Sequence, residues 1–265
     1  MLLMITNKCL EGCPHCMECS NPNGGMMSEA VFKKAVKFLG FLGGNVILIS
    51  GGEPTLHPMF YEFCKKLNYD YKILFSVCSN GTWYNDESIV SQIQRISKFE
   101  HFVGMQVYSN KLFYKDYEEI KAHAGFFKSL GKNIRFEESP IISMKDLGRA
   151  KGCDTAQKMS DESGHFQSCL NSSLMARQVR HPSMFCRNFE RVTFQFCHPM
   201  VDFNGDVHLS ESWMCQSSGN VVDDSFVTIW NNMANFVPCG GCKDYQRFRR
   251  SLRPDIIKAK EILNK

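Results

Sequence analysis

The sequence lacks the features that mark several protein classes. The chain has little excess charge of either sign, because 31 Lys and Arg residues nearly balance 27 Asp and Glu residues and leave a net charge of +4. This balance gives no strong argument for a nucleic-acid partner or an acidic membrane surface. No apolar run approaches the roughly 18 residues of a membrane span, and Val46–Ile49 is typical of the runs present. The chain also has no internal repeat, no low-complexity tract and no secretory signal, since the apolar Met1–Thr6 has no basic segment before it. We therefore expect neither a membrane nor a specific nucleic acid among its partners.

Cysteine, by contrast, is abundant, with 13 in 265 residues. Disulfide scaffolds occur mainly in short secreted chains, and this chain is long, has no signal and has an odd number of cysteines. We therefore expect a cytoplasmic protein whose thiols stay reduced, and there a group of cysteines indicates metal binding. Two of them, Cys64 and Cys78, lie in expected core elements and are interpreted as small hydrophobic residues.

The first half of the chain repeats a strand, a loop and a helix about every 30 residues, which is typical of parallel βα units. The expected strands are Leu2–Ile5, Val46–Ser50, Tyr71–Cys78, His101–Tyr108 and Asn133–Glu137. The expected helices begin after an N-cap at Ser28 and then cover Met59–Leu67, Asp86–Ile96 and Asp116–Leu130. Arg191–Phe196 is a candidate sixth strand. In such folds the chemistry lies at the carboxyl ends of the strands.

The rest of the chain changes in character. Residues 139–185 have little periodicity and are interpreted as loops and short helices, a candidate lid. Beyond them, Met200–Phe203 and Asp206–Leu209 predict a hairpin with a type I′ turn at Asn204-Gly205, and Ser225–Met233 predicts a short helix. We expect two domains, residues 1–185 and residues 186–265.

Three cysteines follow the first strand within eight residues: Cys9, Cys13 and Cys16. Iron–sulfur clusters are usually held by four thiolates, so three would leave one iron with an open position, which suits a catalytic centre. The alternative is a zinc knuckle made of Cys13, His15, Cys16 and Cys19.

A second motif, Gly51-Gly52-Glu53-Pro54, follows the second strand about 35 residues after the cysteines. Together the C-x3-C-x2-C and Gly-Gly-Glu-Pro motifs resemble the radical S-adenosylmethionine (radical SAM) superfamily. This resemblance implies an α/β fold, a partial (β/α)6 TIM-like barrel. It also implies that Cys9, Cys13 and Cys16 hold a [4Fe-4S] cluster whose fourth iron binds S-adenosylmethionine. Reductive cleavage of that cofactor would give a 5′-deoxyadenosyl radical that abstracts hydrogen from an unactivated carbon.

The same resemblance suggests which side chains contact the cofactor. Gly51 and Gly52 would let the backbone approach it closely, Glu53 or the adjacent carbonyls would accept from its ammonium group, and Pro54 would stiffen the turn. His15, Asn80 and Gln106 are the further cofactor-binding candidates. Tyr108 stands where the family often has an Asp, so no ribose contact is expected there.

A second group of cysteines lies towards the C-terminus: Cys197, Cys215, Cys239 and Cys242, with Cys186 as a rival to Cys197. A zinc ribbon is one interpretation of this spacing. The segment also resembles the SPASM or twitch extensions of radical SAM enzymes, a small iron–sulfur extension built of a β-hairpin and a helix. That resemblance implies one auxiliary [4Fe-4S] cluster.

The function expected from these resemblances is radical modification of a ribosomal peptide or protein by crosslinking, oxidation or epimerisation. The alternatives are a small-molecule radical SAM dehydrogenase or mutase acting on an aminocyclitol, sugar or nucleotide, and a non-enzymatic electron-transfer or zinc-binding module. Because the first barrel strand begins at Leu2, we expect a separate leader-peptide-binding protein or a small substrate. A reductase, flavodoxin or ferredoxin would supply the electron. Cys153 and Cys169, in the irregular middle, are weak candidates for a catalytic thiol.

Overall fold

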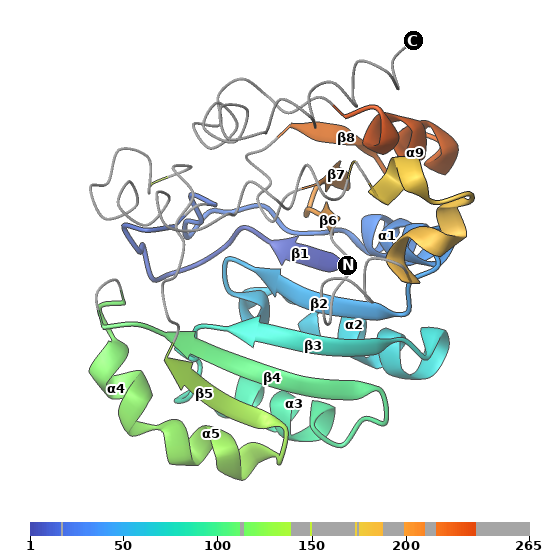
Figure 1. The fold of residues 1–265 in the computed structure, drawn as a ribbon. Coiled ribbons are helices and arrows are strands. Elements are labelled where there is room, and N and C mark those ends of the chain that lie inside the picture. The colour runs from blue at the N-terminus through green and yellow to red at the C-terminus, as the bar shows by residue number, and fades with distance from the viewer. Residues whose placement is uncertain are drawn as a thin grey trace, which may run out of the picture.

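The structure, a computed structural model, describes residues 1–16, 18–111, 114–138, 149, 173, 175–187, 199–209 and 216–236. Within these ranges a single sheet of eight strands runs through the molecule in the order β5-β4-β3-β2-β1-β6-β7-β8 (Figure 1). The first five strands are β1 (Leu2–Thr6), β2 (Val46–Gly51), β3 (Leu74–Ser79), β4 (Phe102–Ser109) and β5 (Ile134–Glu138). Each is parallel to its neighbour. The predicted parallel α/β architecture is thus confirmed, and the carboxyl ends of β1 to β5 meet at one edge.

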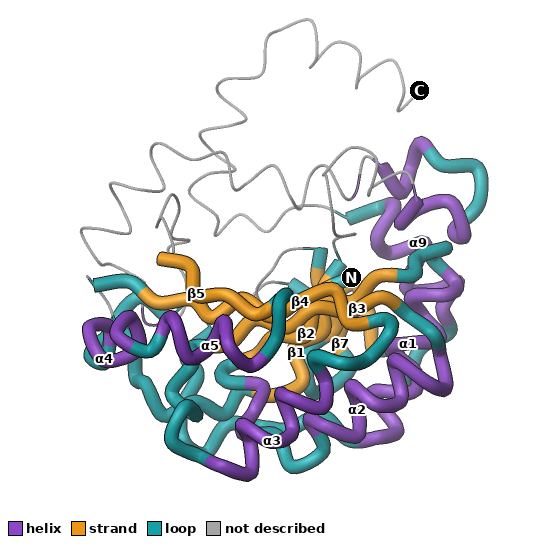
Figure 2. Tube along the Cα trace, turned by 90° about the horizontal axis from the view of Figure 1, so that it is seen from below, coloured by secondary structure: helices purple, strands orange, loops and turns teal. Residues whose placement is uncertain are grey.

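The helices between these strands cover one face of the sheet (Figure 2). They are α1 (Glu29–Phe41), α2 (Phe60–Lys66), α3 (Glu87–Ile96), α4 (Tyr117–Ala122) and α5 (Ala124–Leu130). Side chains that act as N-caps begin two of them, since Ser28 accepts from the Val31 amide and Asp86 accepts from the Ser88 and Ile89 amides. The main hydrophobic core lies between these helices and the sheet, where Phe32 stacks on Phe63 with the ring centroids 4.2 Å apart.

Two elements differ from the sequence prediction. The helix expected over Asp116–Leu130 is broken at His123, whose imidazole Nδ1 lies 2.8 Å from the Glu119 carbonyl oxygen while its ring stacks on Tyr84. The strand expected from Tyr71 begins at Leu74 instead, because Leu67–Tyr71 forms a π-helical turn that ends at Lys72 with a φ of 52°.

The C-terminal strands extend the same sheet beyond β1. β6 (Met200–Val201) pairs in parallel with β1, and β7 (Asp206–His208) and β8 (Ser217–Asn220) follow in antiparallel pairs. The helix α9 (Phe226–Ala234), capped by Ser225, lies beside α1, where Phe226 contacts Phe38 (Figure 1). The predicted hairpin and helix are therefore present, whereas the candidate strand Arg191–Phe196 lies outside the described residues.

The turn of this hairpin is not of type I′, which needs a positive φ at both central residues. Only Gly205 has one, at 95°. The Gly205 amide donates to the Asp202 carbonyl at 3.0 Å, which leaves a loop of three residues ending in a left-handed glycine. The Asp202 carboxylate favours this loop because it accepts from the amides of Asn204 and Asp206.

Candidate functional site

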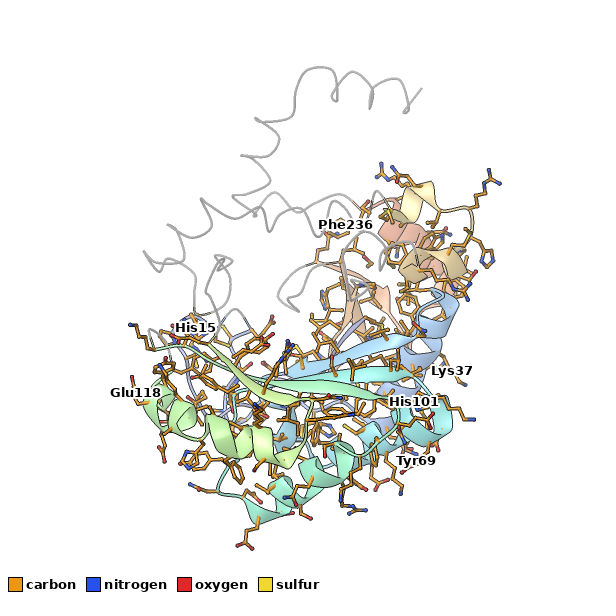
Figure 3. All side chains as sticks on the ribbon, turned by 60° about the horizontal axis from the view of Figure 1, so that its bottom comes forward. His15, Lys37, Tyr69, His101, Glu118 and Phe236 are labelled. Carbon is orange, nitrogen blue, oxygen red and sulfur yellow. The ribbon has the colours of Figure 1, made fainter. Side chains whose placement is uncertain are left out.

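The three N-terminal cysteines lie on the loop that follows β1, which we call the cysteine loop (residues 7–21). Backbone hydrogen bonds join the two ends of this loop, since the Cys9 amide donates to the Asn21 carbonyl at 3.0 Å and the Asn21 amide donates to the Asn7 carbonyl at 3.2 Å. All three cysteines line a single pocket at the carboxyl ends of the strands. The other lining residues are Glu11, His15, Glu18, Ser20, Gly51, Gly52, Asn80 and Tyr114. His15 marks this end of the sheet in Figure 3, opposite His101 and Lys37.

Gly51 and Gly52 let the end of β2 approach the cysteine loop. A Cβ on Gly52 would lie 2.4 Å from the Lys8 carbonyl oxygen and 2.9 Å from Cys9 Cβ, and one on Gly51 would lie 2.4 Å from the Thr6 carbonyl oxygen. The backbones are close enough to bond, because the Gly52 amide donates to the Thr6 carbonyl at 2.8 Å. The glycines are thus required by the protein's own backbone, and both also line the pocket where a ligand would lie.

Glu53 ties the ends of β2 and β3 together. Its side chain is buried, and its two carboxylate oxygens accept from Thr55, Ser79 and the Asn80 amide, the last at 2.7 Å. Burial raises the pKa of this carboxyl, and the hydrogen bonds from Asn80 and Thr55 oppose the increase. The Glu53 carboxylate therefore faces the start of the β3–α3 loop. Pro54, also buried, opens the short 3-10 turn Pro54–Leu56 behind it.

Two further candidates come from β3 and β4. Asn80 lines the pocket, and its side-chain amide lies 3.8 Å from Cys9 Sγ. Gln106 lies one strand further away, where it accepts from the Tyr108 hydroxyl at 2.5 Å and lies 3.5 Å from Glu137. The structure therefore brings Asn80 to the cysteines, whereas Gln106 does not line that pocket.

Burial dominates the electrostatics of the cysteines. It raises the pKa of Cys9 to about 11 and the pKa of Cys13 to about 12, and neighbouring carboxylates and thiols add to both increases. The side chains of Cys9 and Cys13 are therefore protonated thiols at neutral pH. Because metals bind the thiolate, loading of the site must release protons.

Two aromatic side chains, His15 and Tyr114, line the same pocket as the cysteines. The rings of His15 and Tyr114 are 5.2 Å apart and tilted by 58°. Burial lowers the pKa of His15 to about 4, with Arg149 contributing further, so this imidazole is neutral at physiological pH. Burial and then the cysteines raise the pKa of Tyr114. Tyr114 was missed by the sequence analysis, because one tyrosine in a loop after β4 carries no pattern.

Arg149 is the second residue that the sequence analysis missed. It comes from the aperiodic middle of the chain and contacts the cysteine loop at three points. Its Nε donates to the Cys13 carbonyl at 3.0 Å, a terminal guanidinium nitrogen donates to the Ser20 carbonyl at 2.7 Å, and its own amide donates to the Cys16 carbonyl at 3.0 Å.

The comparisons with known proteins agree with this geometry. Residues 3–133 match the family described as the Radical SAM superfamily. This match covers 131 of the 265 residues, just under half of the chain. It contains the cysteine triad, the Gly-Gly-Glu-Pro motif, Asn80 and Tyr114, whereas Arg149 lies outside it.

Solved structures show a similar fold. One is native anSMEcpe with bound AdoMet and a Cp18Cys peptide, 16% identical, with a TM-score of 0.53 over 89% of this chain and 81% of that one. Another is SuiB from Streptococcus suis bound to the precursor peptide SuiA, 11% identical, with a TM-score of 0.53 over 89% of this chain and 65% of that one. At these identities the likeness concerns the fold alone. No curated protein matches the sequence.

The residues of this matched range fit an iron–sulfur cluster and a charged cofactor. The three cysteines share one pocket, and the glycine backbone beside them leaves no side chain in the way. In the described ranges no three Cys, His, Asp or Glu side chains are grouped closely enough to hold a single metal ion. The zinc knuckle of Cys13, His15, Cys16 and Cys19 is therefore not preformed, and Cys19 does not line the pocket.

Glu11 places a buried acid in the same pocket. Its side chain is 8% exposed, and one carboxylate oxygen, Oε2, has no hydrogen-bond partner. Burial raises the pKa of Glu11 to about 7, and the nearby Asp116 carboxylate adds to the increase. A cationic group in the pocket would satisfy this oxygen, as the ammonium and sulfonium groups of S-adenosylmethionine could.

We expect Glu11→Gln to stabilise the metal-free protein at high pH. A carboxyl whose pKa is higher in the folded than in the unfolded chain favours folding at low pH, so stability falls as the pH rises from about 4.5 towards 7. The variant should gain about 1–3 kcal/mol over the wild type at pH 8 and little at pH 4.5. Urea unfolding under anaerobic, reducing conditions would measure this.

Glu118→Gln is the matched control, because Glu118 is exposed on the neighbouring helix α4 (Figure 3). In this control, the free energy of unfolding should change between pH 4.5 and pH 8 by the same amount as in the wild type. If Glu11→Gln also showed the wild-type change, Glu11 would not titrate in this way.

The remaining predicted site residues are not tested. The auxiliary-cluster candidates Cys197, Cys215, Cys239 and Cys242 and the candidate catalytic thiols Cys153 and Cys169 lie outside the described residues. Cys186 is described, fully buried and disulfide-bonded, and its amide donates to the Leu42 carbonyl at 2.9 Å. A sulfur in a disulfide is not a thiolate ligand, so this structure does not favour Cys186 as the rival to Cys197, and this cysteine is not reduced as the sequence predicted. Among the described helices, none is long and apolar enough to cross a membrane.

Proposed function

We propose that this protein is a radical SAM enzyme that modifies a ribosomally made peptide. The observation that carries the proposal is the pocket in which Cys9, Cys13 and Cys16 lie beside Gly51 and Gly52, inside the range that matches the Radical SAM superfamily. The cysteines would hold a [4Fe-4S] cluster and the rest of the pocket S-adenosylmethionine. When bound and reduced, this pair would supply a 5′-deoxyadenosyl radical capable of removing hydrogen from an unactivated carbon.

The chain's own residues prepare the pocket for that chemistry. The Asn80 side-chain amide approaches Cys9 Sγ, and the Ser20 amide donates to Cys16 Sγ at 3.4 Å. Hydrogen bonds to cluster sulfurs tune the reduction potential. His15 and Tyr114 supply ring surface to the lining of the pocket, and the Glu11 carboxylate offers a charge partner to a cationic ligand. Gly52 and Glu53 fix the distance between β1 and β2.

Peptide modification is the favoured substrate class because both similar structures were determined with bound peptides. At 16% and 11% identity this supports the proposal without deciding it. We further propose an auxiliary [4Fe-4S] cluster on Cys197, Cys215, Cys239 and Cys242, because the rival fourth ligand, Cys186, is disulfide-bonded. The proposed partners are an electron donor, a reductase or a protein of the flavodoxin or ferredoxin class, and a separate leader-peptide-binding protein. The reducing cytoplasm is the proposed compartment, where cluster thiolates persist.

The proposal predicts the metal content and the products of the purified protein. Anaerobically reconstituted protein should contain roughly eight irons per chain for two [4Fe-4S] clusters, and with dithionite and S-adenosylmethionine it should release 5′-deoxyadenosine. A short peptide encoded beside its gene should then change in mass. About four irons would remove the auxiliary cluster. Stoichiometric zinc and no 5′-deoxyadenosine would contradict the proposed chemistry, and turnover of a sugar or cyclitol instead of the peptide would contradict the substrate class.

A further inference from the structure

Arg149 is joined to the cysteine loop more extensively than a surface arginine needs to be. Its guanidinium bonds two carbonyls that lie on either side of Cys16, those of Cys13 and Ser20, at 3.0 and 2.7 Å. Its backbone amide bonds the carbonyl of Cys16 itself at 3.0 Å. Two of the three proposed cluster ligands therefore have their carbonyl oxygens held by one residue.

The planar guanidinium matters for this arrangement. Arginine presents several N–H donors in a fixed fork, so two carbonyls bound by one guanidinium are held at a set separation. A lysine has a single ammonium on a flexible stem and does not fix that separation. In the described part of the loop between Cys13 and Ser20, the other backbone hydrogen bonds are long, with the Cys16 amide 3.2 Å from the Cys13 carbonyl and the Cys19 amide 3.4 Å from the Cys16 carbonyl. The Ser20 amide also donates to Cys16 Sγ at 3.4 Å.

Arg149 also brings a permanent positive charge to this loop, because the guanidinium stays protonated in proteins. The pocket itself is lined by two acids, Glu11 and Glu18. A cluster held by three thiolates gains one negative charge when it is reduced, and the charge around a cluster is one of the factors that set its reduction potential. A fixed positive charge nearby stabilises the reduced form, which raises that potential.

We propose that Arg149 is a positioning residue that fixes the cysteine loop through its forked hydrogen bonds and raises the reduction potential of the cluster. This inference rests on the proposed function, since it assumes a cluster on Cys9, Cys13 and Cys16. The step that it favours is the transfer of one electron from a low-potential donor, dithionite in the test below, to the oxidised cluster. No bond is made or broken in that step.

Two substitutions separate the effect of the paired guanidinium hydrogen bonds from the effect of the positive charge. Arg149→Gln removes the charge and most of these hydrogen bonds, whereas Arg149→Lys keeps the charge but loses the paired hydrogen bonds. Arg95→Gln is the control, because Arg95 is exposed on α3 and lies over the ring of Tyr61. Each full-length protein is reconstituted anaerobically and titrated with dithionite while electron paramagnetic resonance follows the reduced-cluster signal that S-adenosylmethionine alters. That signal identifies the cluster with the open iron.

We expect the potential of Arg149→Gln to be clearly more negative than that of the wild type, with Arg149→Lys close to the wild type and Arg95→Gln unchanged. Iron loss to a chelator should be about tenfold faster in both Arg149 variants, as is usual when a residue supporting metal ligands is removed. If Arg149→Gln does not fold, the rate of iron loss from Arg149→Lys tests the positioning role alone.

If the reduction potential of the cluster in Arg149→Gln equalled that of the wild type, Arg149 would not raise the potential. If Arg149→Lys lost iron as slowly as the wild type, the paired hydrogen bonds would not be needed to position the cysteine loop. Wild-type protein that shows no signal sensitive to S-adenosylmethionine would contradict the proposed function itself, and this inference with it.

Discussion

Replacing Cys9, Cys13 and Cys16 together with alanine should abolish cleavage of S-adenosylmethionine. The three side chains line one pocket, and a cluster needs thiolate ligands that alanine cannot supply. Reconstituted iron should fall from roughly eight to about four per chain if the auxiliary cluster is present, and 5′-deoxyadenosine should fall to the level of a reaction without protein. Iron analysis and chromatography of the nucleoside products measure the two effects.

The matched control is Cys64→Ala, which also removes a buried thiol. Cys64 lies on α2, fully buried in the core between helices and sheet, and it is not among the residues that line the pocket. It should cost about 1 kcal/mol of stability through the small cavity left behind, and leave iron content and cleavage unchanged. Activity that survives the triple substitution would place the cleaving cluster elsewhere in the chain.

Several of the predicted site residues line one pocket because the signals that marked them are local. Spacing identified the cysteine triad, and strand rhythm placed Cys9, Gly51 and Asn80 after successive parallel strands. The carboxyl ends of such strands meet at one edge, so these residues had to come together, and they line one pocket. The thiol of Cys64 was likewise correctly assigned to the core, whereas Cys78 is only partly buried and is not part of the core cluster.

The features that were missed depend on specific side-chain contacts, some of them between distant parts of the chain and some within a few residues. Arg149 bonds a carbonyl 136 residues earlier, and no pattern in a single sequence reports a side chain bound to backbone carbonyls. His123 interrupts a helix whose periodicity continues through it, because its ring bonds the Glu119 carbonyl and stacks on Tyr84 from another loop. The hairpin turn was assigned from the Asn-Gly pair alone, whereas the Asp202 side chain selects the longer loop.

Gly51 and Gly52 show most clearly how the structure adds to a reason inferred from the sequence. Their lack of side chains was recognised from the motif and attributed to a close approach by the cofactor. The structure adds a second reason, since the nearest atoms to a Cβ at either position belong to the protein's own β1 and cysteine loop. The motif therefore joins two strands whether or not a ligand is bound, and its loss has consequences for folding as well as for binding.

Gly52→Ala should destabilise the protein and misplace the cysteine loop. The new Cβ would lie 2.4 Å from the Lys8 carbonyl oxygen, 2.8 Å from its carbon and 2.9 Å from Cys9 Cβ, contacts that only a shift of backbone can relieve. We expect a loss of about 3 kcal/mol, the upper part of the usual range for overpacking. Because the shift moves Cys9, reconstituted iron should fall as well. Urea unfolding of the metal-free protein and iron analysis would measure both.

Gly40→Ala gives the control of opposite sign. Gly40 is exposed within α1, and a Cβ there has no atom within 4 Å. The substitution should stabilise the protein by about 0.5–1 kcal/mol, because alanine loses less backbone entropy than glycine in a helix. Iron content should not change. If Gly52→Ala unfolded at the same urea concentration as Gly40→Ala, β2 and the cysteine loop would have to be further apart than they are here. If Gly52→Ala were unstable yet bound iron normally, the glycine would serve the fold alone, and the loop would adjust around the cluster independently of β2.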